Sequence, residues 1–499
     1  MSQNTSRAAS KNTSQDIWQD TSNRKQDLRA VLRKVEQEGE LIRVKREVDP
    51  LIEIPAVVKA LAKLPKIPVL LFENVKKFPG MKACGAFFGD RTRVLRSLGL
   101  PLEPTAMNMR ILEALEKPLA PRIIQRAPCK ENIRKPPLDL GKIIFPTKGA
   151  SQSKHLYYHP VVFTKHPETG HVNMGMYRVT LQPRGQVTVN LRVTQHGGMH
   201  LQAAKAMGAP LQVALCLGLH PSIYEAATSE LPYGYDEVGL AGALVDEPVE
   251  MVKAETVDIL VPAHAEVVIE GEIRPPYKLG SEGPWPEYLG YLGMNINPPL
   301  MDVTAVTFRS QPIVPLFVPG AIPNVVSIGN EAQLLRTLRA FAGEFVVDVA
   351  FTHGARRHHA IVKVHKAHPH HEGYQLNVAM AAFAHGSSTA LDQVTIVDED
   401  IDIRNYREVD WAVSTRCNFS KQVHLLPEAR SHQNNPIAGV RELSEEPVVT
   451  GKMIVDATIP WAYRVAEKSP GITFFTRSSW PEVDLGTYLE PKDKKRWLR

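Results

Sequence analysis

VNMGMYRVTLQPRGQVTVNLR, residues 172–192, indicates how the middle of this chain folds. Apolar residues and threonine dominate on both sides of Pro183-Arg184-Gly185, which predicts two β-strands joined by a turn. Arg178 lies within the otherwise mostly apolar first strand. Because an unpaired buried guanidinium is costly, we expect a carboxylate beside it, either from a protein glutamate or from a substrate.

More strands are predicted around this stretch. HAEVVIEGEI at 264–273 and MDVTAVTF at 301–308 alternate apolar and polar residues, as half-buried strands do. A helix over MHLQAAKAM, 199–207, precedes an apolar strand over LQVALCLGL, 211–219. Residues 131–325 are therefore expected to form a β-rich, barrel-like domain with helices around it.

Both flanks of this domain alternate helices and strands, which predicts an α/β organisation. The N-terminal segment, residues 26–130, begins with an apolar stripe at helical spacing, made of Leu28, Val31, Leu32 and Val35. In the C-terminal segment, residues 326–499, helices are predicted over NEAQLLRTLRAFA, QLNVAMAAFAH and REVDWAVSTR, and strands over HHAIVKVHK and QVTIVDEDIDI. Residues 1–25 are polar and are expected to form a flexible tail.

Composition narrows the class of protein. A net charge of +6, from 59 basic and 53 acidic residues among 499, is too small to indicate nucleic-acid binding. No apolar run is long enough to predict a membrane-spanning helix. The four cysteines are far apart without a C-x-x-C pair, and the polar N-terminus lacks a signal-peptide core. These features predict a cytoplasmic protein with reduced thiols.

The loop GSEGPWPEYLGY, residues 280–291, carries Glu282 and Glu287 on either side of Gly-Pro-Trp-Pro. Two prolines exclude a helix interior or a central strand, so the acids stand on a stiff loop beside an aromatic ring. Different surroundings could push their pKa values apart and leave one carboxyl protonated as a general acid. An exposed loop with two solvated acids is the alternative, and the spacing does not decide between them.

Three residues far apart in the sequence have side chains suited to a hard divalent cation: Asn173, His196 before a Gly-Gly pair, and Glu237. Together they suit manganese or magnesium and leave positions for phosphate oxygens and water. Thiolates are absent from the set, which argues against structural zinc. Their spacing is no evidence that they meet, so unrelated positions in the fold are the alternative.

A histidine-rich segment, residues 353–371, also attracts attention as a metal site. It lacks carboxylates, and most of its histidines alternate with basic residues, which favours a solvated basic face. Contact with an anionic group on a substrate, such as a coenzyme phosphate, is the other interpretation.

In their order along the chain these residues resemble the UbiD-type decarboxylases, a family that includes ferulate/cinnamate decarboxylases and the enzyme of ubiquinone biosynthesis. The resemblance runs from roughly residue 26 to 470. Its motifs are N-x4-R at 173–178, QH at 195–196, DEVGLAGAL-x5-E from 236, SEGPWPEYLGY from 281, and IVDEDIDI with VDWAVSTRC. The E-G-P-x-x-E-x-x-G-Y string with its upstream N-x4-R is specific, and the aspartate-rich strand agrees independently.

The resemblance implies prenylated FMN bound in a split β-barrel, with the C-terminal α/β domain serving oligomerisation. Asn173, His196 and Glu237 would bind manganese or magnesium, which bridges to the flavin phosphate. Backbone carbonyls near Met174 and Ala226 would hold potassium. The family's cofactor contacts fall here on Met176, Tyr177, Arg178, Gln195, His196, Ser229 and Glu237.

The resemblance also implies catalytic roles for an arginine and two acids. Arg178 would orient the substrate carboxylate, Glu282 would pair with Arg178, and Glu287 would protonate the carbon that loses carbon dioxide. Carbanion character needs an electron sink, which prenylated flavin offers and no protein side chain does. The implied reaction is non-oxidative decarboxylation of an aromatic, heteroaromatic or α,β-unsaturated acid, with reversibility left open.

Two departures from the family limit what can be transferred. A lysine that several members place near the flavin phosphate is not evident, and Ser387, Ser388 or backbone amides in AHGSSTALD could replace it. PLFVPGAIPN, residues 315–324, does not match the cinnamate enzymes, so the substrate is not assigned. The expected partners are a small carboxylic acid, a flavin prenyltransferase as cofactor supplier, and further copies in a homodimer or homohexamer.

Two other classes of protein compete with a decarboxylase. A flavin-dependent oxidoreductase on the same barrel would need a nicotinamide-handling feature, and no G-x-G-x-x-G fingerprint follows a predicted strand. A non-catalytic flavin-binding subunit of a carboxylase complex would not need a proton donor, whereas Arg178, Glu282 and Glu287 are all present.

Overall fold

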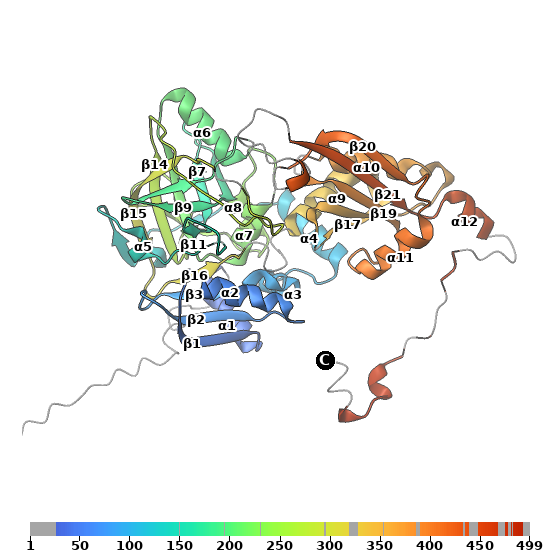
Figure 1. The fold of residues 1–499 in the computed structure, drawn as a ribbon, viewed down its shortest axis with the longest axis horizontal. Helices are drawn as coiled ribbons and strands as arrows, with labels where there is room; N and C mark the ends of the chain where they lie inside the picture. Colours follow the sequence, from blue (N-terminus) through green and yellow to red (C-terminus); the bar gives the residue numbers. More distant parts are fainter. Residues whose placement is uncertain are drawn as a thin grey trace, which may run out of the picture.

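The computed structural model describes residues 26–492, with gaps at 149, 194, 230, 294–295, 319–327, 353, 386–389, 433–434, 439–447, 468–474, 478–480 and 482. The tail predicted at 1–25 lies outside the described residues. Figure 1 shows a small N-terminal sheet below a large curled sheet, with a C-terminal sheet on the right. This is the mixed α/β fold with a barrel-like centre that the sequence predicted. None of the helices described is long and apolar enough to cross a membrane.

The N-terminal sheet has the strand order β1-β2-β3-β16. Its strands are β1 (Leu41–Val48), β2 (Val69–Val75), β3 (Lys82–Gly85) and β16 (Ile313–Leu316), the last contributed by the far end of the middle segment. Helices α1 (Leu28–Gln37), α2 (Glu53–Ala60) and α3 (Arg91–Leu98) accompany it, whereas the next helix, α4 (Pro104–Glu116), packs against α9 (Ile328–Ala342). The stripe predicted on α1 is buried, so helical spacing identified its core face correctly.

The largest sheet curls into a split barrel with the strand order β6-β9-β10-β15-β14-β11-β7-β8, and β5 pairs with β15. Its strands are β5 (Asn132–Arg134), β6 (Tyr157–Tyr158), β7 (Val161–Lys165), β8 (Val172–Met176), β9 (Val179–Gln182), β10 (Gln186–Val189), β11 (Leu211–Leu217), β14 (Val267–Ile273) and β15 (Leu300–Phe308). Consecutive strands β8 and β9 do not pair, because β8 is at one edge of the sheet and β9 is next to the other. The chain therefore crosses the opening of the barrel between them.

This crossing corrects the predicted position of Arg178. Tyr177 and Arg178 lie between β8 and β9, outside both strands, whereas the sequence predicted one strand through Arg178. The reason is that β8 pairs with β7 while β9 pairs with β6 and β10, so the chain changes edges within two residues. Arg178 is consequently placed at the split of the barrel.

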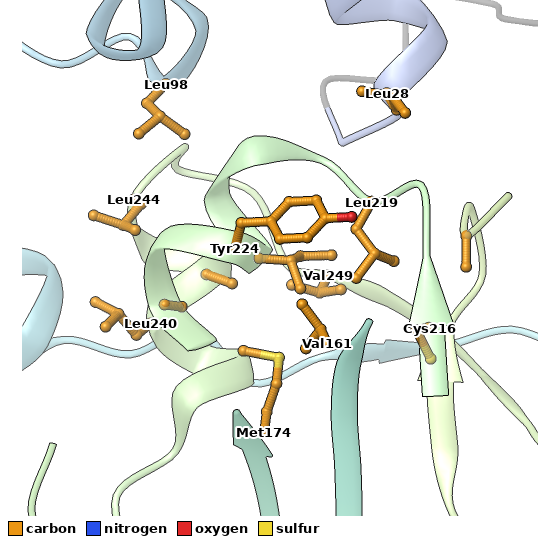
Figure 2. Close-up of a cluster of buried hydrophobic side chains, with 14 of the residues drawn as sticks. Leu28, Leu98, Val161, Met174, Cys216, Leu219, Tyr224, Leu240, Leu244 and Val249 are labelled. Carbon is orange, nitrogen blue, oxygen red and sulfur yellow. The ribbon is translucent and has the colours of Figure 1, made fainter. Parts of the chain in front are cut away.

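Helices pack against the barrel over a shared apolar core (Figure 2). Tyr224 of α7 (Pro221–Thr228), Leu240 of α8 (Glu237–Ala243) and Met174 of β8 meet there. Because side chains alternate along a strand, burial of Met174 in this core directs its neighbour Asn173 to the opposite face. The remaining elements of this region are α5 (Leu140–Ile143), α6 (His196–Met207) and a small sheet of β4 (Arg122–Ile123), β12 (Glu250–Lys253) and β13 (Leu260–Pro262).

The C-terminal sheet has the strand order β17-β18-β19-β21-β20. Its strands are β17 (Val346–Thr352), β18 (Arg356–Val364), β19 (Gln393–Asp398), β20 (Val423–Arg430) and β21 (Val449–Ala457). Its helices are α9 (Ile328–Ala342), α10 (Tyr374–Ala384), α11 (Tyr406–Arg416) and α12 (Trp461–Glu467). The helices and strands predicted for this segment are present, although β19 ends earlier than expected.

The histidine-rich segment is not the solvated face that its charge pattern favoured, at least in its first half. Strand β18 lies between β17 and β19, and its residues are buried or half-buried. His358 is buried and pairs with Asp392, a partner that lies far away in the sequence. Beyond the strand, His365, His368 and His370 are exposed, as the sequence predicted.

Candidate active site

Arg178 contacts both glutamates of the 280–291 loop. Its Nη1 donates a hydrogen bond to Glu287 Oε1 at 2.9 Å, and its Nε donates one to Glu282 Oε1. Thr180 Oγ1 donates to the other oxygen of Glu282 at 3.2 Å. The Glu282 side chain is 0% exposed and that of Glu287 is 13% exposed, which excludes the alternative of two solvated acids. We call Arg178, Glu282 and Glu287 the acid–arginine group.

Backbone hydrogen bonds hold the loop on both sides of the proline-containing turn. Glu282 and Ile296 each donate their N–H to the other's carbonyl oxygen at 3.0 Å. The Glu287 N–H donates to the Tyr291 carbonyl oxygen at 2.8 Å. Between the two acids, Ser153 Oγ donates to the Pro284 carbonyl oxygen at 2.9 Å, so a side chain from outside the loop also fixes its position.

The acid–arginine group has one cation for two carboxyl groups. Burial raises the pKa of Glu282, and the charge of Arg178 only partly offsets this. Burial alone would lower the pKa of Arg178, but the two glutamates raise it above the usual value. Arg178 therefore stays charged, and Glu282 holds a proton to a higher pH than an ordinary glutamate.

Aromatic side chains enclose the group on one side. Arg178 Cζ lies 5.3 Å from the centroid of the Trp285 ring, within the range of a cation–π contact. Tyr157 and His159 pack against the same indole with centroid distances of 4.2 and 5.1 Å. Burial, with a smaller contribution from Arg178, lowers the pKa of His159 to about 3, so its ring is neutral near pH 7. This neutral, apolar wall keeps water away from one face of the acids.

A second polar group is built around the Tyr177 hydroxyl, one residue before Arg178. Asn173 Nδ2 and the Gly197 N–H both donate to this hydroxyl, at 3.2 and 3.1 Å. Gly197 packs closely here, because a Cβ at this position would lie 3.0 Å from the same hydroxyl oxygen and the Tyr177 ring would have to shift. The six residues 173–178 therefore connect the second polar group to the acid–arginine group.

Glu237 and His196 complete this second group. His196 Nδ1 lies 3.7 Å from Glu237 Oε1, and the Met174 N–H donates to Glu237 Oε2 at a long 3.4 Å. A buried carboxylate ordinarily makes shorter, charge-assisted bonds of about 2.7–2.9 Å. Two ligands at about 2.1 Å from one ion lie at most about 4.2 Å apart, so these groups fit a shared divalent cation.

The third predicted ligand also fits such an ion. Asn173 uses its amide nitrogen for the bond to Tyr177, which leaves the amide oxygen as a ligand. Among the described residues, no group of three His, Cys, Asp or Glu side chains gathers around a metal position. The predicted set contains two such residues and one asparagine, so it is a different type of ligand set.

The structure shows where the other predicted cofactor contacts lie, but it does not test their role. Met176 ends β8, and Gln195 precedes α6 with its side chain exposed. Ser229 ends α7, where its Oγ donates to the Glu225 carbonyl oxygen at 2.8 Å. Ser387 and Ser388, and the part of the 315–324 segment from residue 319 onward, lie outside the described residues.

The sequence interpretation missed several residues that touch the acid–arginine group or its loop, among them Thr180, Tyr157 and His159. The sequence could have indicated Thr180, because it follows Arg178 by two residues and such residues face the same side of an extended chain. Tyr157, whose hydroxyl accepts the Gly283 N–H at 3.3 Å, and His159 carry no motif. They reach Arg178 because β6 pairs with β9, placing Tyr157 opposite Thr180.

A cavity of about 540 Å³ lies elsewhere, beside the turn between β9 and β10. It contains none of the predicted catalytic or ligand residues, and we assign it no role. Its lining residues are Leu138, Asp139, Leu140, Leu181, Gln182, Pro183, Arg184 and Gly185.

Three family models match the chain in succession. Residues 32–115 match the N-terminal domain of 3-octaprenyl-4-hydroxybenzoate carboxy-lyase, residues 122–322 its Rift-related domain, and residues 324–457 its C-terminal domain. The chain belongs to the UbiD family. The resemblance drawn from the motifs is thereby confirmed, and this UbiD protein is an enzyme of the carboxy-lyase class.

Its relatives include characterised decarboxylases. A phenolic acid decarboxylase of Sedimentibacter hydroxybenzoicus is 30% identical over 455 residues, which cover 87% of this chain and 92% of the relative. A pyrrole-2-carboxylic acid decarboxylase of Pseudomonas aeruginosa is 28% identical over 498 residues, which cover 94% and 97%.

Solved structures of similar proteins include the UbiD-class enzyme HmfF from Pelotomaculum thermopropionicum in complex with FMN. It is 33% identical with a TM-score of 0.83, over 93% of this chain and 100% of that chain. An evolved dimeric form of HmfF in complex with prFMN has a TM-score of 0.79 and 32% identity over the same shares.

Proposed function

We propose that this UbiD protein catalyses the non-oxidative decarboxylation of an aromatic, heteroaromatic or α,β-unsaturated carboxylic acid with prenylated FMN. The same groups would serve the reverse carboxylation. The observation that carries the proposal is the half-buried Arg178 held between Glu282 and Glu287 at the split of the barrel. The phenolic acid and pyrrole-2-carboxylic acid decarboxylases among its relatives support the substrate class.

Arg178 is proposed to orient the substrate carboxylate. Its Nε and Nη1 contact the two glutamates, and within the described residues its Nη2 makes no hydrogen bond. A carboxylate can therefore bind at Nη2 without displacing either acid. Because the glutamates share the guanidinium, the substrate is held in place without the strong ground-state binding that would slow the loss of carbon dioxide.

Glu282 and Glu287 are proposed to have different roles because their exposure differs. The Glu282 side chain is fully buried and bonded to both Arg178 and Thr180, which suits an anchor for the guanidinium. The Glu287 side chain is 13% exposed, so it can regain a proton from water between turnovers. Glu287 is the proposed acid that protonates the carbon after carbon dioxide leaves.

Prenylated FMN, when bound, supplies the electron sink that decarboxylation requires. The residues proposed to hold it are Met176, Tyr177, Arg178, Gln195, His196, Ser229 and Glu237. Asn173, His196 and Glu237 are the proposed ligands of Mn²⁺ or Mg²⁺, and carbonyls near Met174 and Ala226 would hold K⁺. The long contacts of the buried Glu237, and the FMN and prFMN complexes of HmfF, support this assignment.

The organisation of the enzyme in the cell is part of the same proposal. Residues 26–130, 131–325 and 326–499 are the proposed N-terminal, cofactor-binding and oligomerisation domains of a cytoplasmic homodimer or homohexamer. A flavin prenyltransferase would supply the cofactor. The dimeric form recorded for HmfF supports association of this kind.

The test is to produce the protein with and without a co-expressed flavin prenyltransferase. The absorbance spectrum and carbon dioxide release from phenolic, pyrrole, furan and cinnamic acids are then measured. We expect release only from the co-expressed preparation. Equal activity in both preparations would reject the cofactor, and a flavin-loaded protein that releases no carbon dioxide from any of these acids would count against the reaction.

A further inference from the structure

Tyr288 is the residue that follows the proposed proton donor, and its side chain leaves the barrel. Its hydroxyl lies 3.0 Å from Nε2 of His358, which stands on β18 of the C-terminal sheet. The two rings are stacked with centroids 6.2 Å apart, and Arg356 of the same strand lies over the Tyr288 ring at 5.8 Å. The acid-bearing loop is therefore fastened to a different sheet from the one that carries Arg178.

The other ring nitrogen of His358 contacts Asp392. Its Nδ1 lies 2.8 Å from Asp392 Oδ2, and the other oxygen of Asp392 accepts hydrogen bonds from Lys452 Nζ at 3.0 Å and Ser431 Oγ at 2.8 Å. Burial would raise the pKa of Asp392, but these hydrogen bonds lower it overall, so the carboxylate is ionised. An ionised Asp392 places the imidazole proton on Nδ1, which leaves Nε2 to accept from the Tyr288 hydroxyl.

The turn after Glu287 transmits this contact to the acid. The Glu287 N–H donates to the Tyr291 carbonyl oxygen at 2.8 Å, and the Gly290 N–H donates back to the Glu287 carbonyl oxygen at 2.9 Å. Gly290 has φ +91°, which glycine adopts readily and other residues rarely do. Tyr288 lies inside this closed turn, so a displacement of its ring displaces the Glu287 backbone.

We propose that Tyr288, His358 and Asp392 form a clamp through which the C-terminal sheet positions Glu287 against Arg178. Tyr288 and His358 are positioning residues, since they act through Glu287 and not on the substrate. The inference rests on the proposed function for its effect on turnover, whereas the clamp itself can be measured without substrate.

The principal test uses the flavin-loaded enzyme and the variant Tyr288→Phe, which removes one hydroxyl and keeps the ring. We expect kcat to fall about tenfold with KM nearly unchanged, because one hydrogen bond is lost and the acid is misplaced while Arg178 still binds the carboxylate. The matched control is Tyr291→Phe, the same change in the same loop at a side chain that is 61% exposed. Equal kcat values for wild type and Tyr288→Phe would overturn the proposal.

A second pair of variants separates positioning from general loosening of the fold. His358→Gln keeps a hydrogen-bond acceptor near the position of Nε2, whereas His358→Ala does not. We expect His358→Gln to retain several times more activity than His358→Ala, and the double variant Tyr288→Phe/His358→Ala to be no slower than His358→Ala. Independent, multiplying losses would show that the two residues do not act together and would overturn the clamp.

Amide hydrogen exchange of residues 281–293 tests the clamp without any turnover. In Tyr288→Phe we expect the Glu287 amide to exchange several times faster than in wild type or in Tyr291→Phe. Unchanged exchange would overturn the inference even if the enzyme proved to be a decarboxylase. Faster exchange in a protein that released no carbon dioxide would sustain the clamp and reject the proposed function instead.

Discussion

Two buried arginine–carboxylate groups in this protein differ in charge balance. The anchor group, made of Asp27, Arg29, Glu266 and Arg309, joins α1 to the barrel. Arg29 donates two hydrogen bonds of 2.7 Å to Glu266, and Arg309 donates to Asp27 at 3.0 Å. It contains two cations and two acids, whereas the acid–arginine group contains one cation and two acids.

This difference in charge balance bears on which of the two groups takes part in the reaction that we propose. The anchor group is complete in itself, because each buried charge has a protein partner of opposite sign. Burial raises the pKa of Glu282, so the acid–arginine group can hold a proton at a higher pH than an ordinary glutamate does. Within the part of the chain that the structure describes, the contacts of the buried Glu237 carboxylate are long, at 3.4 and 3.7 Å. These are the two groups at which we propose that a proton, a substrate or a metal ion acts.

Replacing the proposed proton donor should have the largest effect. Glu287→Gln leaves Arg178 with one carboxyl partner and removes the acid, so we expect turnover to fall by about 10²- to 10⁴-fold. Flavin and metal content should stay at wild-type levels, as read from the absorbance spectrum and elemental analysis. Normal turnover in a fully loaded Glu287→Gln enzyme would remove Glu287 from the reaction.

Removing one acid from each group should lower the free energy of unfolding by different amounts. Glu266→Gln leaves two buried arginines with Asp27 alone and should cost about 3–5 kcal/mol of unfolding free energy. Glu282→Gln leaves Arg178 paired with Glu287, a balanced group, and should cost no more than about 1 kcal/mol. Denaturant midpoints of the two variants measure this contrast. A similar loss in both would show that charge balance does not distinguish the groups.

Removing a proposed metal ligand should weaken cofactor retention and leave the anchor group intact. In His196→Ala we expect metal affinity to fall more than about tenfold and flavin to be lost with the metal. Elemental analysis and flavin absorbance of the purified protein provide the measurement, with His370→Ala, at an exposed position, as the control. A His196→Ala protein that keeps its full metal content would exclude His196 from the metal site.

Acid should destabilise both regions through their buried histidines. Burial lowers the pKa of His159, near the acid–arginine group, and of His220, at the start of α7, to about 3. Between about pH 6.5 and pH 3 the unfolded chain binds these protons and the folded chain does not. The contribution of these histidines to the free energy of unfolding is therefore fully present above about pH 6.5. As the pH is lowered towards 3, it decreases by about 1.4 kcal/mol per pH unit for each histidine.

The variant His220→Asn tests this pH dependence. It should reduce the slope of unfolding free energy between pH 4 and 6 by about one proton. His370→Gln, at an exposed position, should leave the slope unchanged. An unaltered slope in His220→Asn would mean that His220 takes up its proton in the folded state.

Local patterns predicted most of the elements of this fold because spacing along the chain reports directly on burial. The α1 stripe is buried as expected, and the strands over 264–273 and 301–308 became β14 and β15. The side-chain types needed for the site could also be read from the sequence, since the residues within N-x4-R and within E-G-P-x-x-E are close to one another along the chain. The motifs indicated the family for the same reason.

Which distant residues meet depends on the tertiary structure and could not be read from the sequence. The break at Tyr177 and Arg178 follows from β8 and β9 pairing at opposite edges of one sheet, which no local window contains. Tyr157 reaches the acid loop through the β6–β9 pairing, and His358 is buried because Asp392 lies behind it. The physical reason is that a buried polar side chain is tolerated only with its partner, and the partner is chosen by folding.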